Sequence, residues 1–85
     1  KNLTIFLNRA GVKELIGDKR GALEDYNQVI SLKPELAIAY RKRADIMYSL
    51  GKKNLACLDW RKSFNLGNKK IGEWFLSKGS SWCKT

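Results

Sequence analysis

Residues 17–26 read GDKRGALEDY, and residues 51–60 read GKKNLACLDW. Glycine, lysine, alanine, aspartate and an aromatic residue recur in the same order, and the second copy begins 34 residues after the first. A constant period of roughly 20 to 50 residues is typical of proteins in which one supersecondary unit is repeated and stacked. The two copies therefore predict two tandem structural units in this chain.

The same shift aligns positions well outside the quoted stretch. Within each unit the apolar residues recur at three- and four-residue steps, which is the spacing of one face of an α-helix. We therefore expect each unit to be a pair of antiparallel helices with an apolar core, to which Trp60 and Phe64 contribute in the second unit. The further aligned pairs are Phe6 with Tyr40, Arg9 with Arg43, Ala10 with Ala44, Ile16 with Leu50 and Leu32 with Leu66.

Glycine and proline mark the ends of the expected helices. Gly17 and Gly51 follow the first helix of each unit, and glycine accepts the left-handed backbone conformation that closes a helix. Pro34 prevents the second helix of the first unit from continuing and disfavours helical geometry at Lys33. Asn54 is the expected N-cap of the second helix in the second unit.

Small residues predict how closely the paired helices approach. Ala10 and Ala22 lie where the two helices of the first unit would cross, and Ala44 and Ala56 repeat this arrangement in the second unit. A short side chain at each crossing lets the helix axes come close while flanking aromatic residues fill the surrounding space.

Composition agrees with a small helical domain. The 85 residues are 44% hydrophobic, and one proline and seven glycines are too few for a β fold with many turns. We expect one all-α domain over residues 1–85. Because the chain begins with lysine rather than methionine, we also expect it to be a segment of a longer protein.

These residues resemble the tetratricopeptide repeat (TPR) family, whose 34-residue motif has aromatic, small, glycine and proline residues at fixed positions. The resemblance implies two helix-turn-helix repeats, residues 3–36 and 37–70, in an α–α superhelix. It also implies a capping helix at residues 69–78, in which Trp74 packs on the second repeat, followed by a tail to residue 85. The matching residues are Phe6, Ala10, Gly17, Ala22, Tyr26 and Pro34 in the first repeat and Tyr40, Ala44, Gly51, Ala56 and Trp60 in the second.

Two arginines depart from the family motif. Arg9 and Arg43 stand where leucine is usual, and each is followed sixteen residues later by an aspartate, Asp25 or Asp59. We expect an ion pair between the two helices of each repeat, because a guanidinium and a carboxylate match in geometry. The alternative is that both arginines face solvent and bind a ligand.

The resemblance also implies where a partner would bind. Members of the family bind peptides or proteins in a concave groove lined by the first helix of each repeat. Carried over to this chain, the groove is cationic and edged by an aromatic residue, which suits an acidic peptide. The lysine and asparagine clamp that chaperone-binding members use for a C-terminal carboxylate is absent. The expected groove residues are Asn8, Ile38, Arg41, Lys42, Asp45 and Tyr48, together with Thr4, Leu7, Gly11 and Glu14.

Charge leaves other partners open. Residues 1–36 carry six basic and five acidic residues, net +1, whereas residues 37–85 carry eleven basic and three acidic residues, net +8. Such asymmetry favours an acidic partner. A protein-binding scaffold is the main expectation, and the alternatives are RNA or DNA binding through the basic second half and self-association through repeat stacking.

Enzymatic activity is not expected. The chain has no histidine, which excludes histidine-based acid–base catalysis and histidine-containing metal sites. We therefore expect no catalytic, cofactor-binding or metal-ligating residues. Cys57 and Cys83 are too few for a disulfide framework and are expected to be reduced thiols. No apolar run is long enough to span a bilayer, so the expectation is a soluble cytoplasmic protein.

Overall fold

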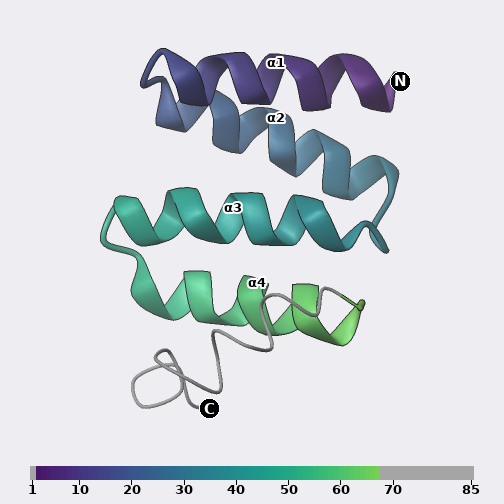
Figure 1. The fold of residues 1–85 in the computed structure, drawn as a ribbon, viewed down its shortest axis with the longest axis vertical. Coiled ribbons are helices and arrows are strands. Elements are labelled where there is room, and N and C mark those ends of the chain that lie inside the picture. The colour runs from purple at the N-terminus through teal and green to yellow at the C-terminus, as the bar shows by residue number, and fades with distance from the viewer. Residues whose placement is uncertain (1, 68–85) are drawn as a thin grey trace.

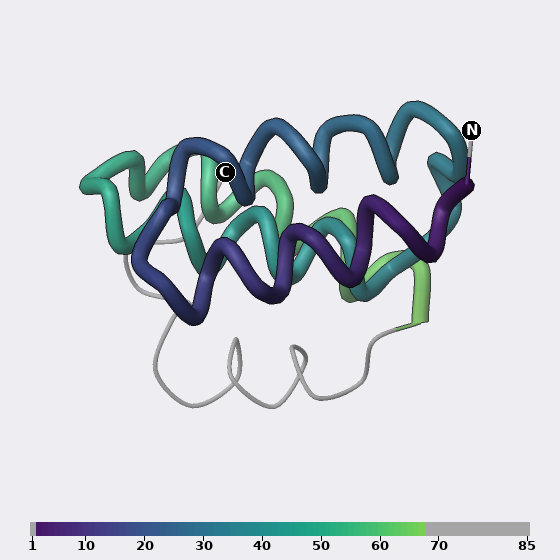
Figure 2. The backbone as a smooth tube through the Cα atoms, turned by 90° about the horizontal axis from the view of Figure 1, so that it is seen from above, coloured from purple at the N-terminus to yellow at the C-terminus, as the bar shows by residue number. Residues whose placement is uncertain are grey.

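The computed structural model describes residues 2–67, which form four α-helices and no strands. Figure 1 shows the helices stacked in chain order, each antiparallel to the one before, with α1 packed on α2, α2 on α3 and α3 on α4. Seen along the stack, α2 is offset to one side of α1 (Figure 2). The expectation of an all-α fold built from helix pairs is confirmed for this part of the chain. The helices are α1 Leu3–Leu15, α2 Lys19–Leu32, α3 Ala37–Ser49 and α4 Lys53–Asn65.

The first helix of each pair ends as the glycines predict. Gly17 has a φ of 85° and Gly51 a φ of 83°, both in the left-handed region that other residues adopt only with strain. At the far end of α2, Lys33 leaves helical geometry with a φ of −144°, and Pro34 follows. The Pro34 carbonyl accepts a hydrogen bond of 2.8 Å from the Tyr40 hydroxyl, which ties the connection to α3.

The starts of the second helices differ between the two pairs. The Asp18 carboxylate caps α2 by accepting a hydrogen bond of 3.0 Å from the Gly21 amide. Lys52 is the N-cap residue of α4, the position that Asp18 has before α2, but its side chain makes no capping hydrogen bond. Asn54 lies inside α4, so its expected role as N-cap is wrong. The helix begins before Asn54, and the connection keeps the length that it has in the first pair.

The four alanines lie at the helix crossings, as expected. Ala10 and Ala22 are fully buried in one cluster with Tyr26, and Ala44 and Ala56 are fully buried in a second cluster with Trp60. Both clusters combine small residues at the close approach with one large aromatic side chain beside it. This is the packing that the alanine spacing predicts.

The second helix pair packs directly on the first. Ile46 of α3 is 5% exposed and belongs to the cluster formed by Ala10, Ala22 and Tyr26. Arg43 of α3 also donates a hydrogen bond of 2.9 Å to the Asn27 side chain on α2. Apolar and polar contacts therefore join the two pairs into one unit.

Three residues expected on the apolar faces are exposed instead. Ile16 and Leu50 are 72% and 36% exposed, because each lies just beyond the last helical residue, where the chain turns away from the partner helix. Phe64 is 45% exposed in the last turn of α4, the final described helix. Their assignment to the core is therefore corrected.

Cys57 differs from the expectation of a reduced thiol. It is 4% exposed and disulfide-bonded. Two cysteines make no spacing pattern that predicts a pairing, and only tertiary structure can bring a second sulfur to a cysteine. The expected capping helix, with Trp74, and the tail residues Trp82 and Cys83 lie outside the described residues.

Candidate functional site

The two arginines that depart from the TPR motif are held by aspartates. Arg9 donates two hydrogen bonds to Asp25, from Nε to Oδ2 at 2.9 Å and from Nη2 to Oδ1 at 2.8 Å. Lys13 adds a second cation, with its Nζ 3.3 Å from Asp25 Oδ2. Asp25 itself is 2% exposed, so α1 supplies the countercharges for a carboxylate buried on α2.

The second pair has the same geometry. Arg43 Nε lies 2.6 Å from Asp59 Oδ2, and Nη2 lies 2.9 Å from Oδ1. Its remaining nitrogen bonds Asn27, so each guanidinium nitrogen of Arg43 has a partner within the fold. Both expected ion pairs are confirmed. The Arg43 side chain is 23% exposed, whereas the Arg9 side chain keeps 53% of its surface exposed while it is paired.

The ion pair with Arg9 also lowers the pKa of Asp25. Hydrogen bonds from Arg9 hold the pKa of the Asp25 carboxyl below its ordinary value, although burial acts in the opposite direction. The nearby Lys13 ammonium lowers that pKa further. Asp25 is therefore a charged, structural group at neutral pH.

The expected groove residues of the second unit lie along one side of α3. Ile38, Arg41, Asp45 and Tyr48 follow one another at helical steps, and Lys42 is next to Arg41 on the same side. Ile38 and Tyr48 are 38% and 43% exposed, which leaves apolar and aromatic surface open to a partner. We call this set of five residues the α3 face.

Asp45 organises the α3 face. Its Oδ1 accepts a hydrogen bond of 3.0 Å from the Trp60 indole nitrogen on α4, and its Oδ2 lies 3.4 Å from Arg41 Nη1. Burial raises the pKa of Asp45, and the Trp60 bond and the charges of Arg41 and Lys42 oppose that shift. Trp60 thus has two roles, because its ring packs in the core while its N–H orients a surface carboxylate.

Tyr48, at the edge of the α3 face, contacts an aromatic ring and a cation. Its ring centroid lies 5.6 Å from that of Trp60, with an angle of 46° between the planes. Lys53 Nζ lies 5.9 Å from the Tyr48 ring centroid, within the range of a cation–π contact. The exposed aromatic edge is therefore fixed in place.

A buried acidic group from α1 lies close to the α3 face. Glu14 influences the titration of both Tyr26 and Asp45, which places its carboxylate near the junction of α1, α2 and α3. Burial is the main cause of the raised pKa of Tyr26, and Glu14 adds to it. Glu14 Oε2 is buried and accepts no hydrogen bond from the described residues.

The structure thus brings together four of the six expected residues, Arg41, Lys42, Asp45 and Tyr48. Ile38 lies on the same side at the start of α3, whereas Asn8 is an exposed residue of a different helix, α1. The sequence did not predict the hydrogen bond from Trp60 to Asp45 or the effect of Glu14 on the pKa of Tyr26. Trp60 and Asp45 lie fifteen residues apart on paired helices, and each arginine lies sixteen residues from its aspartate. This similar separation was the sequence signal that could have indicated a contact between Trp60 and Asp45.

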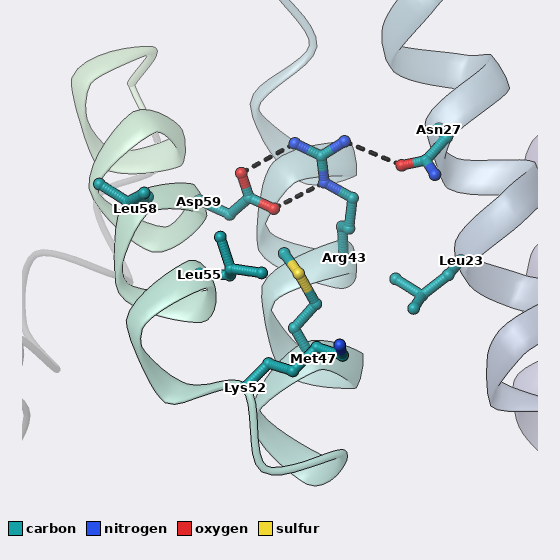
Figure 3. A pocket seen from close by; sticks show the side chains of 8 residues that line it. All are labelled: Leu23, Asn27, Arg43, Met47, Lys52, Leu55, Leu58 and Asp59. Atoms are coloured by element: carbon teal, nitrogen blue, oxygen red, sulfur yellow. Dashed lines mark hydrogen bonds and ion pairs between the residues drawn. The ribbon is translucent and has the colours of Figure 1, made fainter.

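A hollow opens on the other side of α3 (Figure 3). It has a volume of about 450 Å³, and leucine and methionine side chains line it beside the Arg43–Asp59 pair. Figure 3 shows Arg43 reaching Asp59 and Asn27 across one end, which keeps that polar end internally satisfied. The lining residues come from α2, α3 and α4: Leu23, Asn27, Arg43, Met47, Lys52, Leu55, Leu58 and Asp59.

The chain matches no protein-family model, no curated protein and no solved structure. Across residues 2–67, none of the helices has the length and apolar character needed to cross a bilayer.

Proposed function

We propose that this chain is a TPR-like protein-interaction module that binds an acidic, extended peptide along the α3 face. The proposal rests on Lys42, which has no ion-pair partner among the described residues although it stands beside Arg41. Within residues 2–67, Arg41 is paired only with Asp45 at 3.4 Å, a long and exposed contact that contributes little to stability. Two cations are therefore available to a carboxylate of the partner.

The neighbouring groups suit the apolar side chains of a peptide. Ile38 and Tyr48 offer apolar contact at the two ends of the α3 face. A peptide with acidic side chains between apolar ones fits this order of groups.

A charge-reversal experiment tests the proposal. The probe is a fluorescein-labelled peptide of alternating glutamate and alanine, with binding followed by fluorescence anisotropy. Arg41→Glu combined with Lys42→Glu should weaken binding by at least about tenfold, because the two cations that would pair with the peptide carboxylates are replaced by negative charges that repel them. The matched control is Lys19→Glu combined with Arg20→Glu, which changes the net charge equally at exposed positions of α2. Equal weakening by both variants would show non-specific attraction and contradict the α3 face as the site.

One observation favours a second candidate, nucleic-acid binding through α4. Phe64 is 45% exposed on a helix that also carries Lys53, Arg61 and Lys62, and bases stack on aromatic side chains beside cations. Labelled oligouridine tests this alternative. Binding that falls steeply with added salt, and that Phe64→Ala weakens while the α3-face variant does not, would favour RNA over an acidic peptide.

A further inference from the structure

The hollow in Figure 3 lies on the side of α3 that the proposed peptide does not use. Its volume of about 450 Å³ falls within the range of small-molecule sites, which are mostly lined by apolar side chains. Leu55 and Leu58 contribute to the lining and are 48% and 54% exposed. Single exposed leucines are ordinary on protein surfaces, so the first helix pair is the necessary comparison.

Three lining residues of α4 and its N-cap differ in chemical kind from their counterparts in the first unit. The first helix pair folds with an acidic residue, a glycine and a second acidic residue at these positions, so the packing of a pair does not require the leucines. Together the differences remove two negative charges, add a positive charge and create an apolar wall. The 34-residue shift places Lys52 at the position of Asp18, Leu55 at that of Gly21 and Leu58 at that of Glu24.

Lys52 is the least expected of these residues. Asp18 accepts a hydrogen bond from the Gly21 amide and so caps α2, whereas the Lys52 side chain makes no capping hydrogen bond to α4. Lys52 also makes no ion pair within residues 2–67. Figure 3 shows its ammonium group beside Met47, at the end of the hollow opposite the Arg43–Asp59 pair. The hollow therefore has an available positive charge at one end.

The polar groups at the other end are already paired. Arg43 donates from each of its three nitrogens, to Asp59 and to Asn27, and both carboxylate oxygens of Asp59 accept from Arg43. A peptide backbone in the hollow would lose hydrogen bonds to water and find few replacements, whereas a hydrocarbon chain needs none. The hollow thus suits an apolar chain that carries an anionic group at its Lys52 end.

We propose that the hollow binds a medium-chain fatty acid, with the carboxylate at Lys52 and the hydrocarbon chain against Leu23, Leu55 and Leu58. From Lys52 to Asp59 the sequence advances seven residues, or about 10 Å at the helical rise of about 1.5 Å per residue. A zigzag chain of about eight carbons spans a similar length, since each bond of about 1.5 Å advances it by somewhat less. The site goes beyond peptide binding and does not depend on it.

A series of chain lengths tests the site on the 85-residue chain. Hexanoate, octanoate, decanoate and dodecanoate are titrated below the concentrations at which they form micelles, and the amide signals of Leu23 and Leu55 are followed by NMR. From hexanoate to octanoate the dissociation constant should fall about four- to tenfold, because two methylene groups leave water. From decanoate to dodecanoate it should change less than about twofold, because the added groups extend beyond the hollow. An affinity that rises evenly through the series, or no saturable shift, overturns the proposal.

A charge in the apolar wall tests the position of the chain. Leu55→Glu should raise the dissociation constant of octanoate at least about tenfold, since it places a negative charge against the hydrocarbon. The matched control is Leu32→Glu, at a position of α2 that is 44% exposed and outside the hollow, and it should leave the affinity unchanged. Circular dichroism verifies that both variants are folded. Equal weakening by the two variants would exclude the hollow as the site.

The position of the carboxylate has its own test. Lys52→Ala should weaken octanoate binding about two- to fivefold, the range of an exposed ion pair, and leave octanol binding unchanged. Lys33→Ala, at an exposed lysine beyond the end of α2, should affect neither ligand. Equal effects of Lys52→Ala on octanoate and octanol would overturn the assigned orientation. Cosedimentation with phosphatidylglycerol vesicles, in the absence of saturable octanoate binding, would assign the leucines to a membrane surface and overturn the proposal.

Discussion

At the level of single residues, the Arg9–Asp25 and Arg43–Asp59 pairs are the most informative features of this chain. An aspartate that is 2% or 7% exposed must be compensated by charge and hydrogen bonds. Both pairs supply two hydrogen bonds in the same geometry. These arginines are therefore part of the architecture, and the residues available to a partner are found on the α3 face.

The lowered pKa of Asp25 predicts a contribution to stability that depends on pH. A carboxyl group with a lowered folded-state pKa stabilises the fold above its unfolded pKa of about 3.9 and loses that contribution as the pH falls. Asp25→Asn should therefore show a smaller loss of stability than the wild type on acidification below about pH 5. Urea unfolding followed by circular dichroism at each pH measures the difference.

Asp45→Asn serves as the comparison, because burial raises the pKa of Asp45 and its contribution has the opposite sign. Protonation of Asp45 favours the fold as the pH falls, so removing that group should make the acid loss steeper. Identical pH profiles for the two variants would contradict both assignments.

At the level of elements, the crossings of the paired helices decide how each pair packs. Ala22 and Ala56 are fully buried at these crossings, so Ala22→Leu and Ala56→Leu should each lower the free energy of unfolding by about 1–3 kcal/mol through overpacking. Urea denaturation measures the loss. Ser31→Leu, at an exposed position of α2, is the control and should change stability much less. A midpoint unchanged by Ala22→Leu or Ala56→Leu would contradict the close crossing.

The two second helices also differ in how they begin. Asp18 caps α2, whereas Lys52 caps α4 without a side-chain bond. Lys52→Asp should restore the cap and stabilise the protein by about 0.5–2 kcal/mol. The thermal midpoint is the measurement, and Lys52→Ala separates the effect of a new cap from that of losing a positive charge. If Lys52→Ala stabilises as much as Lys52→Asp, the cap is not the cause.

At the level of the whole molecule, the order of the stack sets local stability. α1 packs mainly on α2, whereas α2 packs on both α1 and α3 (Figure 1). At low protein concentration, amide hydrogens in the middle of α1 should exchange at least about tenfold faster than those in the middle of α2, because a helix at the end of a stack opens more readily. Hydrogen–deuterium exchange measures this, and equal protection of the two helices would contradict it.

Much of this architecture was predictable because the sequence repeats with a period of 34 residues. Gly17 and Gly51, the four alanines, and the two Arg–Asp pairs each appear at equivalent positions, so every inference had an internal check. The exposure of Ile16 and Leu50 was missed in both copies, and the other failures lie where the copies differ. Asn54 has a typical N-cap side chain, but the helix begins before it, and Phe64 looks apolar but lies in a turn that no following described helix covers.

The candidate site was predictable only in part. Helical spacing is enough to place Arg41, Lys42, Asp45 and Tyr48 on one side of a helix. It does not show that Trp60 donates to Asp45 or that Glu14 approaches from α1, because those contacts depend on how separate helices come together.

By itself, the sequence determined the helix pairs, their ends and the close crossings, because glycine conformation, proline sterics and side-chain size act locally and recur with the repeat. Only the tertiary structure decided which surfaces stay open. Exposure of Val12 and burial of Ile46 at equivalent positions reflects the presence or absence of a neighbouring helix pair. No local property of valine or isoleucine carries that information, since burial is a property of the packed assembly.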